Sequence, residues 1–160
     1  MSQLPVATVE GIGDGLILCF SGRSRASASN NWQIFRRAFE GDQEVLEILN
    51  QIGRTSEELA TCVKEGDRLG LFEASKREWS LRKRLWSDIE TTETRAIETA
   101  ARKAGASFAR VCGAGGGGVM AIFCPDADQS VVKEKLVAAG GTILDGNATD
   151  NGLKVAISRD

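Results

Sequence analysis

Five glycines fall within six positions, GAGGGG at 113–118, between two apolar segments that are typical of strands, SFARVC at 107–112 and VMAIFC at 119–124. Glycine loses more backbone entropy on folding than any other residue, so a chain that keeps five together has a structural use for them. A tight hairpin turn needs only one or two glycines. The additional glycines indicate that another group approaches the backbone closely, either a ligand phosphate or a second segment of protein. A plain hairpin turn is the alternative.

The context of the glycines excludes the common phosphate-binding loops. The run matches GxGxxG, but a dinucleotide-binding loop is followed by a helix whose N-terminus meets the pyrophosphate, and here a strand-like segment follows. The lysine of the Walker A motif is missing. A protein kinase also requires a His-Arg-Asp catalytic loop, and this chain contains no histidine. Without histidine, the chain also has no Ser-His-Asp or Cys-His catalytic group. Its four cysteines lack the spacing of a zinc site, so we expect no metal ligands in this chain.

The order of the elements predicts an α+β fold. Periods of 2 and 3.6 residues, separated by glycine, proline and capping residues, define the segments. Strands are expected at 15–22, 107–112, 119–124, 142–145 and 153–158, and helices at 30–39, 42–64, 67–86, 92–104 and 126–139. This is the order of the ferredoxin-like split βαβ arrangement with three extra helices in the first crossover. We expect one domain over residues 1–160, a mainly antiparallel sheet and a hairpin through the glycines.

Composition and charge narrow the class of protein. Hydrophobic residues make up 42% of the chain and charged residues 26%, which is ordinary for a globular protein. The net charge of −2 gives no general attraction to nucleic acid or anionic membranes, and no apolar run reaches transmembrane length. The N-terminus lacks the features of a signal peptide, so we expect a cytoplasmic protein.

Two helical segments have a notable pattern, and the first of them leaves an alternative open. The basic stretch KREWSLRKRLW at 76–86 has the residues of a nucleic-acid or phosphosugar patch, but an amphipathic helix with buried tryptophans and solvated charges is favoured. In the first helix, Trp32, Phe35 and Phe39 form the apolar face.

Two motifs resemble those of a known family. ARVCGAGGGGVMAIF at 109–123 resembles the third signature motif of the GHMP kinases, which include galactokinase, homoserine kinase, mevalonate kinase and phosphomevalonate kinase. FSGRSRASASNN at 20–31 resembles the TGKTRxS segment of the sugar-kinase branch, best matched by the D-glycero-D-manno-heptose phosphate kinases. The helical stretch at 38–85 and the approach to the glycines at 91–112 also fit that branch. The resemblance covers nearly the whole chain.

The resemblance implies the C-terminal, ferredoxin-like domain of such an enzyme. The family's phosphate loop, P-x-x-x-G-L-G-S-S-A, and its catalytic aspartate belong to an N-terminal kinase domain, and neither Pro5 nor Pro125 fits that loop. The implied function is phosphoryl transfer from ATP, with Mg²⁺, to a hydroxyl of a sugar or sugar phosphate. The N-terminal domain is the implied partner, and the chain alone is expected to hold no catalytic residue and to be inactive. A binding or assembly domain of the same fold, without catalysis, is the alternative.

The resemblance also assigns roles to residues. It places Gly113, Ala114, Gly115, Gly116, Gly117 and Gly118 at the cleft between domains, beside the nucleotide-binding loop. It implies that Arg25 and Ser27 face the substrate, where an arginine can hold a phosphate through two parallel N–H donors. From the residues alone, a solvated loop with a helix cap is the favoured alternative for these two, and Arg23 is expected at the surface. An isolated domain is expected to self-associate through its bare inter-domain face, with neither nucleic acid nor membrane as a partner.

Overall fold

The computed structural model describes residues 15–23 and 28–146. The elements in chain order are β1 (Leu16–Phe20), α2 (Ala28–Phe39), α3 (Gln43–Glu65), α4 (Arg68–Leu85), the 3-10 helix η1 (Ser87–Ile89), α5 (Thr92–Lys103), β2 (Phe108–Val111), β3 (Val119–Phe123), α6 (Gln129–Ala138) and β4 (Thr142–Leu144). The strand expected at 153–158 lies outside the described residues.

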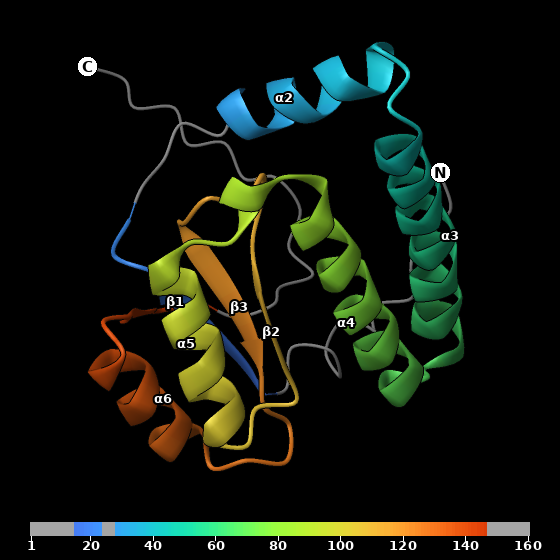
Figure 1. The fold of residues 1–160 in the computed structure, drawn as a ribbon. Coiled ribbons are helices and arrows are strands. Elements are labelled where there is room, and N and C mark those ends of the chain that lie inside the picture. Colours follow the sequence, from blue (N-terminus) through green and yellow to red (C-terminus); the bar gives the residue numbers. More distant parts are fainter. Residues whose placement is uncertain (1–14, 24–27, 147–160) are drawn as a thin grey trace, which may run out of the picture.

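The four strands form one antiparallel sheet in the order β2-β3-β1-β4. This is the ferredoxin-like order, so the predicted fold class is confirmed. β2 and β3 form the expected hairpin through the glycines, and Arg110 lies opposite Ala121 in it. Helices α5 and α6 lie side by side over one face of the sheet (Figure 1). The core lies between these layers, where Cys19, Ile97, Met120 and Leu136 are fully buried.

Helices α2, α3 and α4 are the three extra helices of the first crossover. Asp42 caps α3 by accepting hydrogen bonds from the backbone N–H groups of Glu44 and Val45. Gly66 ends α3 in the left-handed conformation, with φ of 70°, and α4 then runs back along α3. Figure 1 shows α4 between α3 and the sheet. The buried side chain of Trp79 on α4 belongs to the main core, so the helical pair is anchored to the sheet.

The apolar face predicted for α2 is present but exposed. The side chains of Trp32, Phe35 and Phe39 are 66%, 53% and 89% exposed. The opposite edge of the helix packs on the domain, where Ile34 and Asn30 are buried and the Asn30 amide donates to the carbonyl of Asp88. The sequence pattern therefore located the face, but no described segment covers it.

Among the described residues, no helix is both long and apolar enough to cross a bilayer.

Candidate functional site

The glycine loop between β2 and β3 has a backbone that other residues rarely adopt. The φ angles of its glycines are all positive: 75° at Gly113, 80° at Gly115, 82° at Gly116, 114° at Gly117 and 90° at Gly118. A side chain disfavours this conformation because its Cβ crowds the following carbonyl. Four such residues in succession require glycine whatever the loop binds.

Two distant segments of the chain lie against the loop. The N–H of Gly116 donates to the carbonyl of Ile89 at 2.8 Å, and the N–H of Gly118 donates to the carbonyl of Arg23 at 2.7 Å. A Cβ at Gly115 would stand 2.9 Å from the Ile89 oxygen, and one at Gly117 would stand 2.7 Å from the Arg23 oxygen. The close approach indicated by the sequence is therefore observed, and at these two positions it is made by protein backbone.

These contacts occupy two of the N–H donors of the glycine loop. The N–H groups of Gly116 and Gly118 point at protein carbonyls, so a phosphate near the loop has to use other N–H groups. At Gly113 and Gly118, a Cβ would meet none of the described atoms within 4 Å. Glycine at these two positions therefore serves the backbone angle and leaves room beside the loop.

The structure places only part of the sequence-predicted site. Arg25 and Ser27 lie outside the described residues. Arg23, expected at the surface, has a half-exposed side chain that pairs with Glu93 at 3.6 Å. Its backbone contact with Gly118 was missed, because a carbonyl acceptor leaves no signature in the sequence.

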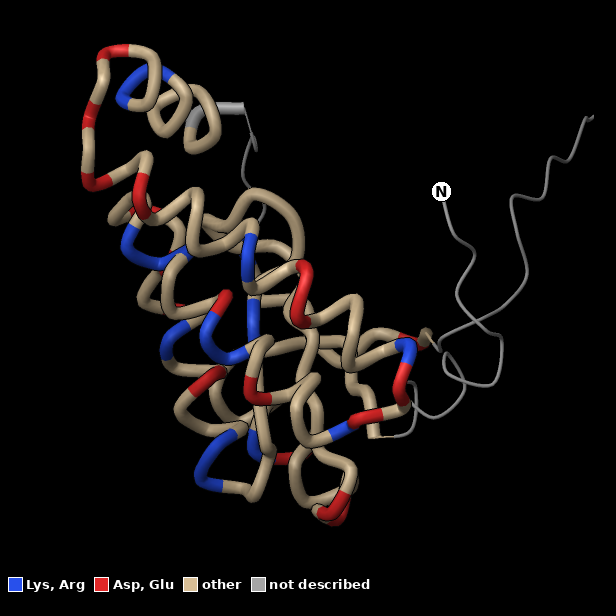
Figure 2. Tube along the Cα trace, turned by 90° about the vertical axis from the view of Figure 1, so that its right-hand side faces the viewer, with Lys and Arg blue, Asp and Glu red and all other residues tan. Residues whose placement is uncertain are grey.

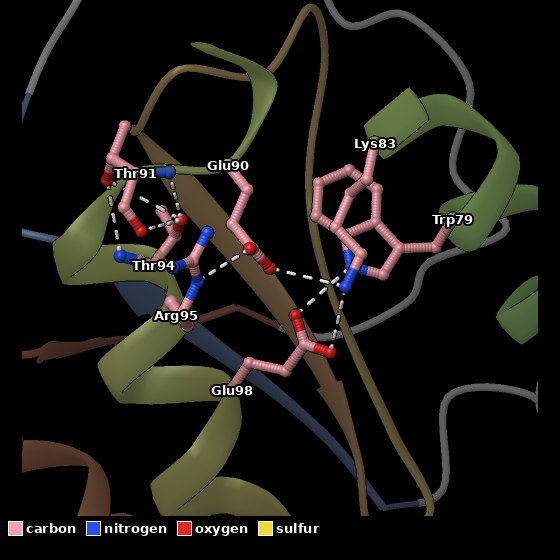
Figure 3. Close-up of polar contacts among 7 residues, drawn as sticks. All are labelled: Trp79, Lys83, Glu90, Thr91, Thr94, Arg95 and Glu98. Carbon is pink, nitrogen blue, oxygen red and sulfur yellow. Dashed lines mark hydrogen bonds and ion pairs between the residues drawn. The ribbon is translucent and has the colours of Figure 1, made fainter. Parts of the chain in front are cut away.

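Sequence reasoning also missed the connection between α4 and α5, residues 86–91, which lies against the other side of the loop. Its Glu90 carboxylate accepts from Arg95 at 2.8 Å and from Lys83 at 3.2 Å (Figure 3). Burial acts to raise the pKa of Glu90, but the hydrogen bonds from Arg95 and Lys83 outweigh it, so this pKa lies below its usual range. Glu90 is therefore held as a carboxylate at neutral pH.

The next residues fix the start of α5. The N–H of Thr91 donates to Thr94 Oγ1 at 2.9 Å, and the N–H of Thr94 donates to Thr91 Oγ1 at 3.3 Å. This reciprocal capping box is buried and satisfies two donors at the helix N-terminus. The capping box thus holds the connection through buried hydrogen bonds directly beside the carbonyl that the loop uses.

The basic stretch at 76–86 is the amphipathic helix that the sequence favoured. Trp79 is buried, with Lys83 and Arg110 near its ring. The charges have acidic partners: Lys76 pairs with Glu73, Arg77 with Glu58, Arg82 with Glu78 and Arg84 with Glu44. Figure 2 shows basic and acidic positions interspersed over the described chain. Paired charges of this kind do not form a phosphate-binding surface.

A groove over α5 and α6 is separate from the glycine loop. It has a volume of about 760 Å³ and is lined by Thr92, Arg95, Ala96, Thr99, Ala100, Lys103, Lys135, Ala138 and Ala139 of α5 and α6 and the segment after α6. No residue of the loop lines it. The candidate site is therefore described by the loop and the two carbonyls that support it.

Residues 83–142 match the family model for the GHMP kinases C terminal. The chain contains a GHMP kinase C-terminal domain. The match begins in the last turn of α4 and ends at the start of β4, so it includes the 86–91 connection and the glycine loop. The GHMP motif identified in the sequence is thus confirmed.

Several proteins that are similar to this GHMP domain are named as kinases. The mevalonate kinase of Thermococcus onnurineus (strain NA1) is 31% identical over 144 residues, which cover 88% of this chain and 42% of that protein. The phosphomevalonate kinase of Streptococcus pneumoniae, solved with phosphomevalonate and AMPPNP, superposes with a TM-score of 0.67 at 21% identity over 82% of this chain and 39% of its own. A putative sugar kinase from Campylobacter jejuni superposes with a TM-score of 0.61 at 18% identity over 96% of this chain and 42% of its own.

These coverages and identities limit what the similarity shows. The chain spans about two fifths of the length of each relative. The two solved structures share the fold with it. The heptose phosphate kinase branch, expected from residues 20–31, is not supported, since the relative found by sequence is a mevalonate kinase.

Proposed function

We propose that this domain is the C-terminal part of an ATP-dependent small-molecule kinase, with residues 1–160 forming one domain that works beside an N-terminal kinase domain. The observation that carries the proposal is the glycine loop, whose backbone is fixed by the carbonyls of Ile89 and Arg23 inside a GHMP kinase fold. A loop fixed in advance costs little to order when a phosphate or a neighbouring loop meets it. The kinase relatives support the same reaction class.

In this proposal the domain positions groups and does not carry the chemical step. The γ-phosphorus of ATP forms a bond to the acceptor oxygen, the bond to the bridging oxygen of ADP breaks, and the acceptor hydroxyl loses its proton. The proton acceptor is assigned to the N-terminal domain, because the resemblance places the catalytic aspartate there. The glycine loop contributes close backbone support beside the phosphates.

Mg²⁺ would neutralise phosphate charge in such a reaction. Among residues 15–23 and 28–146, no three carboxylate or cysteine side chains gather in a way that could hold a metal ion. The described residues therefore do not fit a metal site, and we assign any Mg²⁺ to the ATP phosphates and the partner domain.

The acceptor has two candidate classes. A sugar or sugar phosphate is supported by the segment 20–31, in which Arg25 and Ser27 are the proposed substrate-side residues. The mevalonate class is supported by the Thermococcus onnurineus relative. A non-catalytic binding or assembly domain is the alternative to both.

Transfer of label from γ-labelled ATP in the presence of Mg²⁺ tests this proposal. The complete gene product and the 160-residue chain are each assayed with mevalonate, phosphomevalonate, hexoses and sugar phosphates. We expect the complete product to label one acceptor class and the chain alone to label none. A complete product that binds a ligand of either class but transfers no phosphate would favour the non-catalytic alternative.

A further inference from the structure

The glycine loop is supported by a carbonyl whose position depends on a charged side chain next to it. Gly116 donates to the oxygen of Ile89, and the neighbouring Gly115 has no room for a Cβ against the same residue. Any rotation of the peptide between Ile89 and Glu90 moves this oxygen. Whatever fixes that peptide therefore fixes the middle of the loop.

Contacts of three neighbouring residues, Ile89, Glu90 and Thr91, fix the peptide from both sides. The side chain of Ile89 is buried in the core, and its N–H donates to the carbonyl of Trp86 at 3.2 Å. On the other side, Thr91 is held by the capping box of α5. Between them, Glu90 is tied to Arg95 on α5 and to Lys83 on α4.

Lys83 is itself held in place. Its ammonium lies 5.5 Å from the centre of the Trp79 ring and 3.4 Å from the Glu98 carboxylate, which also accepts from the Trp79 indole N–H at 3.2 Å. Figure 3 shows these side chains converging between α4 and α5. Because Lys83 is held by several groups, its contact with Glu90 joins the 86–91 connection to two helices at once.

We propose that Glu90 is a positioning residue for the glycine loop, acting through the Ile89 carbonyl that accepts the Gly116 N–H. Its carboxylate ties the 86–91 connection to Lys83 and Arg95 through charge-assisted hydrogen bonds, which are stronger and more directional than neutral ones. The consequence for phosphate binding rests on the proposed kinase function, but the coupling between Glu90 and Gly116 does not.

Glu98 provides a matched control. It is a carboxylate of the same cluster and shares Lys83 with Glu90, but it lies on α5 and has no peptide bond to Ile89. Gly118 provides an internal control, because it belongs to the same loop and donates to Arg23 instead. A loss of packing in the cluster would affect both variants, and a loss of overall stability would affect both amides.

Amide hydrogen exchange read residue by residue by NMR tests the coupling in the 160-residue chain without any nucleotide. In Glu90→Gln we expect exchange at Gly116 to accelerate about tenfold more than exchange at Gly118, whose change reports the overall loss of stability. In Glu98→Gln both amides should stay within about twofold of the wild type. Arg95→Gln, a milder change at the surface, should accelerate Gly116 in the same direction and serves if Glu90→Gln does not fold.

Three results would overturn the inference. The first is an unchanged exchange rate at Gly116 in both Glu90→Gln and Arg95→Gln. The second is an equal acceleration of exchange at Gly116 and Gly118. The third is an exchange rate at Gly116 in Glu98→Gln that matches the rate in Glu90→Gln. Failure of the complete gene product to bind or use ATP would count against the proposed function and would leave the exchange result intact.

Discussion

The carbonyl oxygen of Arg23 occupies the space that a side chain at Gly117 would need, 2.7 Å from the position of a Cβ there. The segment that follows β1 is thereby locked against the hairpin that contains the family motif. Arg25 and Ser27, the proposed substrate-side residues, follow Arg23 within four positions of the sequence. The contact therefore ties the two motifs of the sequence to each other through backbone atoms.

Gly117→Ala should destabilise the domain strongly. Its φ of 114° is unfavourable for alanine, and the added Cβ meets backbone, which cannot move aside as a flexible side chain can. We expect a loss of about 2–4 kcal/mol in the free energy of unfolding, measured by urea denaturation. The control is Gly113→Ala, which shares the positive φ but has open space among the described atoms and should lose about 1 kcal/mol. Equal losses in the two variants would show that only backbone conformation matters.

Glu90→Gln should lower stability in a pH-dependent way. Because the folded-state pKa of Glu90 is depressed, its stabilisation is complete above the unfolded-state pKa and is lost as pH falls through the folded-state value. We expect the variant to be less stable by about 1–2 kcal/mol at pH 7. The difference from the wild type should shrink as the pH drops below the usual glutamate pKa. Acid and urea titrations measure it, and a difference independent of pH down to full protonation would contradict the ion-pair explanation.

The exposed aromatic face of α2 should drive self-association of the isolated chain. Trp32, Phe35 and Phe39 lie on one side of the helix that follows the 24–27 segment, and we propose that an N-terminal kinase domain covers them in the complete protein. Contacts between domains of one chain typically bury about 600–1,500 Å², and without that domain a second copy can take its place.

Analytical ultracentrifugation over a range of concentrations measures this association. Replacing the three aromatic residues with glutamine should give a monomer. Leu69→Gln, which removes another exposed apolar side chain on α4, should leave the association unchanged. A wild-type chain that stays monomeric at all concentrations would show that the face has no affinity for a second copy.

The 160-residue chain should show neither sugar nor mevalonate phosphorylation, and its binding of ATP should be weak or undetectable by calorimetry. Its sequence contains no segment of the form of the family's phosphate loop, and the resemblance assigns the catalytic aspartate to another domain. The N–H groups of Gly116 and Gly118 are also already hydrogen-bonded within the chain. Sustained turnover by the pure chain would refute the division of labour between two domains.

The sequence predicted the order of helices and strands along the chain and the β2–β3 hairpin because local patterns determine them. Alternation of apolar residues, glycines at turns and capping residues such as Asp42 all act over a few positions. The exposure of Trp32 was not predictable in this way. A periodic pattern indicates which face of a helix is apolar, but whether another segment covers that face depends on the tertiary fold.

The supports of the glycine loop were also beyond sequence reasoning. Ile89 and Arg23 act through main-chain carbonyls, which every residue type possesses, and their contacts join segments that are far apart in the chain. The glycines did signal close approach, because Gly115 and Gly117 have no room for a Cβ. They could not indicate which segments make it.

The placement of β1 determines when the sheet can be completed as the protein is synthesised. This central strand pairs with β3 on one side and β4 on the other, with Leu16 opposite Phe123 and Phe20 opposite Thr142. Both partners are made on the order of a hundred residues later, whereas α3 and α4 can pair as soon as they emerge. The apolar segment LILCF therefore leaves the ribosome long before it has a neighbour. Until β3 and β4 have been synthesised, only the helices or a chaperone can shield this strand from solvent.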